Sequence, residues 1–203
     1  MKKLLPFFSN LGIVLLASAF VWGQPCKPPS LRGFSLGMSE ADVLNVVPTV
    51  GQVKSGGFGY GYLRINVLPK LYTSYGEDSI EGAVHTKDYP VFEGIDQAAV
   101  NFLDGSVFSV WVRYNSSPKW SSRGDFLEQF AQGLGLPNDF VGDPDRPGSN
   151  PLVFRMPCGS SDFVINLSDL SRPTVTIWDP KIDALLNKRK TDEATKNRKA
   201  VNL

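Results

Sequence analysis

The sequence has few of the residues on which enzyme chemistry most often depends. Its 203 residues include one histidine, His85, and two cysteines, Cys26 and Cys158. C-x-x-C, H-E-x-x-H, G-x-S-x-G and phosphate-loop motifs are all absent from it. The usual signatures of zinc sites, metalloproteases, α/β-hydrolases and nucleotide binding are therefore missing. We predict a protein that is not an enzyme and that needs no cofactor and no metal.

One catalytic alternative stays open. Asp88 follows His85 by three residues, and the chain is rich in serine, so a small exported hydrolase could be built on His85. A single histidine in a segment without periodicity more often makes a surface or hydrogen-bonding contact. The hydrolase is therefore the alternative to a non-enzymatic protein.

The chain also lacks an excess of one charge, with 21 basic and 20 acidic residues. Residues 24–180 hold 12 basic and 17 acidic residues, whereas residues 181–203 hold seven and three. A weakly acidic body argues against nucleic acid as a partner. Residues 181–203 are predicted to form a basic C-terminal helix or tail. The helix should begin at Asp179-Pro180, because proline is favoured at the first helical position. It should fray past Lys188, where apolar residues become rare.

The N-terminus has the layout of a secretory signal peptide, predicted to span residues 1–23. Lys2 and Lys3 precede a largely apolar run over residues 4–20, and small residues follow it. Cleavage before Gln24 and cleavage after residues 17–19 are both compatible with this pattern. A retained anchor is the alternative, but the run is at the lower edge of a spanning length. We expect an exported protein, periplasmic or secreted, with no membrane span after signal removal.

An even number of cysteines in an exported protein favours a disulfide. Cys26 and Cys158 would then close a loop of about 130 residues, and the N-terminus of the mature chain would be held against the last strands. Two free thiols are the alternative.

Alternating apolar residues predict six strands. They lie within residues 62–67, 98–103, 106–114, 152–156, 163–167 and 175–177. Segments 71–90 and 139–150 show no clear period and are expected to be loops.

The strands on either side of Asp104-Gly105 form a predicted hairpin. A two-residue turn would place Phe102 beside Val107. A three-residue loop with a bulge at Gly105 would place Phe102 opposite Ser106 and Val100 opposite Phe108. We favour the three-residue loop because it gathers one apolar face. That face comprises Ala98, Val100, Phe102, Phe108, Val110, Val112 and Tyr114.

Two helices are predicted where a serine precedes an acidic residue by three positions. Ser39 precedes Asp42, and Ser122 precedes Asp125, each followed by an apolar pair. Strand-like segments follow both helices. The fold class is therefore α+β: one domain over residues 24–180, built from two helix-plus-antiparallel-strand units (31–118 and 119–180). These would form one sheet of about six strands with the helices on one face.

The opening Phe34-Ser35-Leu36-Gly37-Met38-Ser39, with Val43 after it, resembles small bacterial envelope domains of the SmpA/OmlA (BamE-like) type. A tandem version resembles the beta-lactamase-inhibitor-protein architecture, and the whole chain resembles uncharacterised exported bacterial proteins. The resemblance implies a short helix followed by an antiparallel sheet. It covers about ten residues, carries no functional residues, and departs from the envelope lipoproteins in lacking a lipid-attachment box.

The alternation that buries one face of the sheet turns a different set of side chains outward. Tyrosine, tryptophan and arginine, the types enriched at binding hot spots, are prominent in it. The predicted binding residues are Tyr62, Arg64, Trp111, Arg113 and Trp178. We predict an exported binding or envelope-interaction module that holds a protein or glycan partner on this face. If the face is covered by a loop or by the last helix, a structural envelope domain is the alternative.

Overall fold

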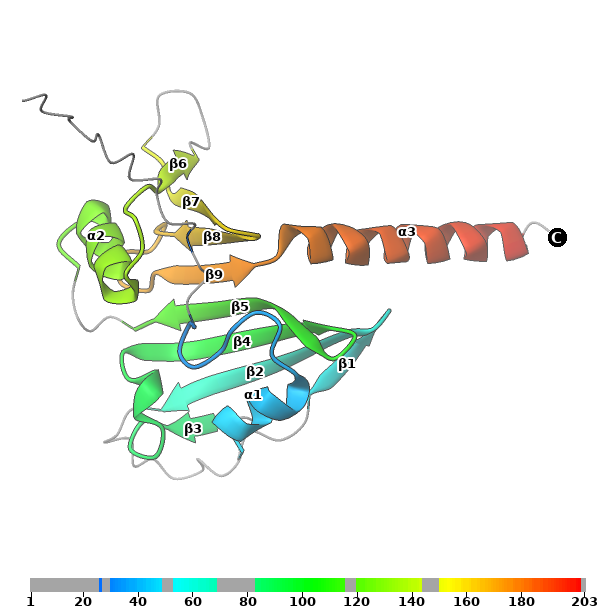
Figure 1. Ribbon diagram of the computed structural model, residues 1–203, viewed down its shortest axis with the longest axis horizontal. Helices are drawn as coiled ribbons and strands as arrows, with labels where there is room; N and C mark the ends of the chain where they lie inside the picture. The colour runs from blue at the N-terminus through cyan, green and yellow to red at the C-terminus, as the bar shows by residue number, and fades with distance from the viewer. Residues whose placement is uncertain are drawn as a thin grey trace, which may run out of the picture.

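In the computed structural model, the described residues contain nine β-strands that form one open sheet, with helices packed against it (Figure 1). The structure describes Cys26 and residues 30–48, 53–68, 83–115, 120–143 and 150–201. The predicted signal peptide lies outside the described residues. The α+β class and the largely antiparallel sheet are confirmed, since β3 is the only described strand that pairs in parallel, with β2.

The strand order is β1-β2-β4-β5-β9-β8-β7-β6. The strands are β1 (Lys54–Gly57), β2 (Tyr60–Leu68), β3 (Ala83–His85), β4 (Ile95–Leu103), β5 (Ser106–Tyr114), β6 (Val141–Asp143), β7 (Val153–Cys158), β8 (Ser161–Asn166) and β9 (Thr174–Trp178). The predicted number of about six strands is therefore too low. All six predicted strands are present, but β1, β3 and β6 have only three or four residues. That is too short for a detectable alternation.

Helices α1 (Glu40–Val46) and α2 (Arg123–Leu134) lie on the same face of the sheet (Figure 1). Ser39 caps α1, because its Oγ accepts from the amide of Asp42 at 3.1 Å while the Asp42 carboxylate accepts from the Ser39 amide at 3.1 Å. Ser122 caps α2 with one of these two bonds, because its Oγ accepts from the amide of Asp125 at 3.1 Å, whereas the Asp125 carboxylate accepts from the amide of Ser121 at 2.9 Å. These caps satisfy amides that the first turn leaves unpaired.

Side chains from both helices and from the inner faces of the long strands share one hydrophobic core. Its fully buried members include Phe34, Phe92, Phe102, Phe126, Phe163, Ile165 and Ile177. Phe92 comes from a short 3-10 helix, η2 (Pro90–Phe92), and stacks on Phe34 at 5.9 Å between ring centroids. We call the face covered by α1 and α2 the inner face and the opposite one the outer face.

The register of the β4–β5 hairpin differs from the prediction. Leu103 pairs with Ser106 and Phe102 with Val107, so the loop is a two-residue turn, with positive φ at Asp104 (50°) and Gly105 (78°). A bulge beyond Val107 then shifts the register again. The predicted pairing of Val100 with Phe108 is wrong.

The predicted inner face nevertheless survives, because the turn and the bulge together shift the register by two residues and thus preserve parity. Val100 pairs with Val110, and both are fully buried in the core. Phe108 is the exception. It belongs to a separate cluster with Leu103 and Leu186, away from the main core.

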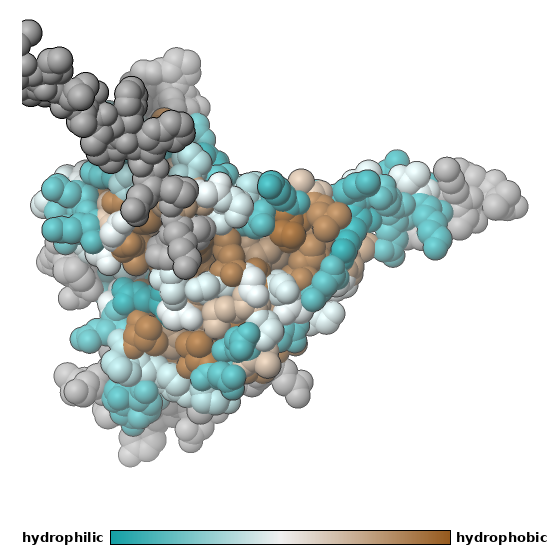
Figure 2. Space-filling model, in the orientation of Figure 1, coloured by the Kyte–Doolittle hydropathy of each residue, from teal (hydrophilic) through white to brown (hydrophobic). Residues whose placement is uncertain are grey.

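Helix α3 (Pro180–Val201) lies on the other side of the sheet from α1 and α2, the two helices that were predicted to share one face. Ile182 and Leu186 pack against Leu103, Phe108 and Tyr60, which point to the outer face. The helix does not end near Lys188. Residues 191–196 continue it as exposed, mainly hydrophilic turns that project from the body (Figures 1 and 2).

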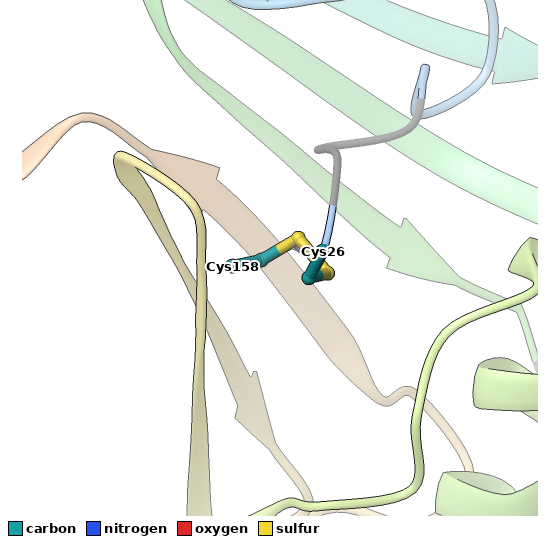
Figure 3. Close-up of a disulfide and its surroundings, with 2 residues drawn as sticks. All are labelled: Cys26 and Cys158. Carbon is teal, nitrogen blue, oxygen red and sulfur yellow. A yellow bond between two sulfur atoms is a disulfide. The ribbon is translucent and has the colours of Figure 1, made fainter. Parts of the chain in front are cut away.

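Cys26 and Cys158 form a disulfide, with their Cα atoms 4.8 Å apart (Figure 3). Cys158 ends β7 and is completely buried. The bond thus fastens the segment before α1 to the half of the sheet that is farthest from it in sequence. Among the described residues, no helix is both long and apolar enough to cross a bilayer.

Candidate functional site on the outer face of the sheet

Strand register places the five predicted binding residues in adjacent rows across the outer face. Tyr62 and Trp178 share one row, in which Asn101 and Ser109 stand between them. Arg64 and Trp111 share the next row, separated only by Ala99. Arg113 lies in a third row beside Thr174. Arg64 is exposed, and the other four predicted residues are half-buried.

The surface is hollowed at the centre of the first row, because the side chains there are small and aromatic side chains stand on either side. Asn101 and Ser109 lie between the rings of Tyr62 and Trp178. A cavity of about 390 Å³ opens over them, between the sheet and the first turns of α3. We call this cavity the α3 pocket.

The floor and the walls of the α3 pocket differ in chemistry. Asn101, Ser109 and Thr176 supply a floor of uncharged polar groups. Ring and aliphatic carbons from Tyr60, Phe108, Trp178 and Leu186 supply walls, and Asp183 and Lys190 of α3 lie at its border. The pocket therefore combines apolar surface with a few polar groups, which is the usual composition of a ligand site.

The tryptophan wall presents carbon atoms to the pocket. The Nε1 atom of Trp178 is enclosed and has no hydrogen-bond partner within the described part of the chain. Trp178 still lines the pocket and is half-buried, so the accessible part of its ring is its hydrocarbon surface.

Tyr60 belongs to the site but is missing from the predicted set. Its ring lies 6.3 Å from that of Tyr62, stacked at 28°, and 6.2 Å from that of Phe108. Its hydroxyl donates to Asn101 Oδ1 at 2.8 Å. Burial raises the pKa of the Tyr60 phenol, with a smaller contribution from Tyr62, so the hydroxyl keeps its proton at neutral pH. Tyr60 lies two residues before Tyr62, so strand alternation places both on the same face. The glycines around Tyr60 obscure the start of the strand in the sequence.

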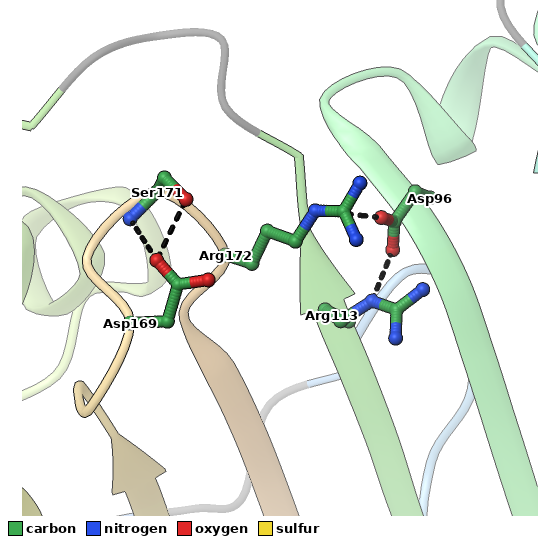
Figure 4. A network of polar contacts seen from close by, with 5 residues as sticks. All are labelled: Asp96, Arg113, Asp169, Ser171 and Arg172. Atoms are coloured by element: carbon green, nitrogen blue, oxygen red, sulfur yellow. Dashed lines mark hydrogen bonds and ion pairs between the residues drawn. The ribbon is translucent and has the colours of Figure 1, made fainter.

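Arg113 is engaged in contacts within the protein rather than extended toward solvent (Figure 4). Its Nε donates to Asp96 Oδ1 at 2.7 Å, and its guanidinium lies 6.0 Å from the centre of the Trp111 ring. Arg172 approaches the other oxygen of Asp96 at 3.9 Å. Asp169 and Ser171 shape the loop before Arg172 through a side-chain hydrogen bond of 2.6 Å. Asp96 therefore holds the Arg113 guanidinium beside the Trp111 ring.

A bidentate ion pair holds α3 over the pocket. Arg189 donates to both carboxylate oxygens of Asp104, at 2.9 and 2.7 Å, and to the carbonyl of Phe58 at 3.1 Å. The hydrogen bond from Arg189 lowers the pKa of Asp104. A side chain at Gly59 would collide with the Asp104 carboxylate, so the β1–β2 turn is shaped to leave room for this pair.

We expect Asp104→Asn to loosen the first turns of α3 without unfolding the body. The variant removes the charge and one acceptor that Arg189 uses, and amide hydrogen exchange in α3 should therefore become faster. The folded-state pKa of Asp104 is lowered, so the stabilisation is present at neutral pH and is lost as pH falls through that lowered pKa. The difference between variant and wild type should thus disappear in strong acid.

Asp192→Asn is the matched control, because Asp192 is an exposed acid on the same helix. Its exchange profile should equal that of the wild type. Equal exchange in Asp104→Asn at neutral pH would show that the ion pair does not hold α3.

A second cavity, of about 520 Å³, lies on the inner side between α2 and the segment that precedes α1. Arg32 and Tyr114 border it, with the guanidinium carbon 5.2 Å from the ring centre. His85, at the end of β3, lines neither cavity. Among the described residues, no group of three or more histidines, cysteines or acids is placed to hold a metal ion.

Comparisons with known protein families, with curated proteins and with solved structures found no match.

Proposed function

We propose that this protein is an exported, non-enzymatic binding module and that the outer face of its sheet is the binding surface. The observation that carries the proposal is the α3 pocket, with its polar floor and aromatic walls on the face opposite α1 and α2, which the first turns of α3 cover only in part. Tyr62, Arg64 and Trp111 extend that surface along the strands. Aromatic and arginine side chains of this kind supply most of the binding energy at interfaces.

Export is part of the proposal and has its own support. The disulfide between Cys26 and Cys158 is the kind of bond that persists in oxidising compartments. The N-terminal sequence has the layout of a signal peptide.

The two-unit architecture also belongs to the proposal. Each half starts with a short capped helix on the inner face and continues into antiparallel strands. The halves meet where the last strand of one, β5, pairs with the last strand of the other, β9. This arrangement supports two related helix-plus-sheet units.

Trp111→Ala tests the binding surface. We expect the variant to bind its partner from the envelope fraction of an exporting bacterium more weakly, with a loss of binding free energy of about 2 kcal/mol or more. The thermal unfolding midpoint should change little, because Trp111 is half-buried and on the outer face. The measurement is the amount of protein and carbohydrate retained on the immobilised variant.

Arg155→Ala is the matched control, since Arg155 lies in the same row, beyond Thr176 and Val164, but outside the aromatic region. It should retain the same material as the wild type. A large loss of stability in Trp111→Ala, or equal retention by both variants, would contradict the proposal.

A further inference from the structure

We propose that the α3 pocket binds an uncharged, polyhydroxylated ligand, namely a segment of a neutral glycan chain. This inference rests on the proposed binding function and names its ligand class. It follows from three properties of the site: the polar groups of its floor, the aromatic surface of its walls, and the opposite charges at its border.

The floor offers hydrogen bonds of the type that sugar hydroxyls need. Ser109 and Thr176 carry hydroxyls that both donate and accept, and Asn101 has an amide group that does both. Asn101 Oδ1 already accepts from Tyr60, which leaves its NH₂ group to donate. Ser109 is only 7% exposed, so a ligand that covered the floor without hydrogen bonds would leave polar groups buried and unpaired.

The walls suit the C–H face of a sugar ring. Aromatic faces carry partial negative charge and attract the electropositive edges of neighbouring groups. Trp178 presents ring carbons while its Nε1 is enclosed, and Tyr60 stands on the opposite side, with its hydroxyl already bonded to Asn101. A sugar ring can place C–H groups on these walls and direct its hydroxyls to the floor.

The charges at the border favour a neutral ligand. Among the described residues, Asp183 and Lys190 are the charged ones that line the pocket, and they carry opposite signs. A free anion or cation would meet one partner and one like charge. Arg64 is exposed in the next row but does not line the pocket.

A peptide bound as an added strand fits less well. The floor belongs to β4, β5 and β9, each of which is paired on both sides. Their backbone groups are already used in the sheet, so no edge is open to strand addition at this site. The ligand must be bound through side chains, as the floor and walls provide.

The test uses the disulfide-bonded protein and four defined neutral probes: maltohexaose, cellohexaose, hexa-N-acetylchitohexaose and laminarihexaose. Binding is followed by titration calorimetry and by tryptophan fluorescence. We expect at least one probe to bind, with an affinity that is unchanged between low and high salt, because a neutral ligand has no charge to screen.

Thr176→Val should weaken that binding about 5- to 10-fold, since it removes one hydrogen-bonding hydroxyl at nearly constant shape. Thr174→Val is the matched control. Thr174 lies two residues away on the same strand and on the same face, but it does not line the pocket, and its variant should bind like the wild type. Trp178→Ala should weaken binding about 30-fold or more.

Failure of all four probes at millimolar concentration would overturn the glycan inference, and so would binding that Thr176→Val leaves unchanged. Retention of envelope protein that is lost in Trp111→Ala, without binding of any sugar, would instead leave the binding module standing with a protein partner. If no sugar bound and Trp111→Ala retained the same envelope material as the wild type, both proposals would be overturned.

Discussion

Removing the Cys26–Cys158 disulfide is expected to lower the free energy of unfolding by about 2–5 kcal/mol. The bond joins residues separated by 132 positions, and a loop of that length restricts the unfolded chain strongly. Reduction of the wild type and the double variant Cys26→Ala/Cys158→Ala should have the same effect. The measurement is denaturant unfolding with and without a reductant.

The double variant serves as its own control, because a reductant should not change its unfolding. Alanine is chosen over serine because position 158 is completely buried and a hydroxyl there would need a partner. A wild-type unfolding curve that did not move on reduction would show that the bond is absent in solution or that it closes no loop of consequence.

Phe126→Ala is expected to lower the free energy of unfolding by about 3–5 kcal/mol. Phe126 is 1% exposed and fixes α2 to the sheet. Its ring lies 4.9 Å from Trp120, 5.6 Å from Tyr114 and 5.9 Å from Phe130, measured between ring centroids. Truncation removes all three contacts and leaves a space that these rings cannot fill. Thermal or denaturant unfolding measures the loss.

Glu128→Ala, at an exposed position on the same helix, should change stability by no more than about 0.5 kcal/mol. If Phe126→Ala were equally mild, α2 would not be anchored through this aromatic cluster.

The longer strands could be predicted because one buried face imposes an alternation over enough residues to be seen. In β2, Leu63 and Ile65 are buried while Arg64 between them is exposed. The helix starts capped by Ser39 and Ser122 could also be predicted, since side-chain capping is a local interaction. Only the chemistry of nearby residues is needed for either.

The hairpin shows where such reasoning fails. Burial does not alternate from Val107 to Val110. The bulge places Phe108 and Ser109 together on the outer face, where residues of α3 lie over them. No rule of alternation predicts this bulge. Alternation places Phe108 in the inner core, whereas the side chain packs on the outer face against residues that include Leu186, which lies far along the chain in α3.

The candidate site was only partly accessible to prediction for a related reason. Parity alone identifies Tyr62, Trp111 and Trp178 as outward residues, but it says nothing of what lies above them. The α3 pocket exists because Arg189 and Leu186 hold the last helix against the outer face. These are long-range contacts, which depend on tertiary packing rather than on local sequence. The binding role of these residues stays a prediction.

The seam between β5 and β9 also bears on how the chain assembles. Most strand pairings lie within one half and join segments close in sequence, whereas the seam joins residues 109–113 to residues 174–178. Local hairpins form before such distant pairings, so β5 and β9 would be open edges until late in folding. An open edge can accept the matching strand of another molecule and produce a swapped dimer. The disulfide spans the same seam, so in the oxidised chain it keeps each half beside its own partner.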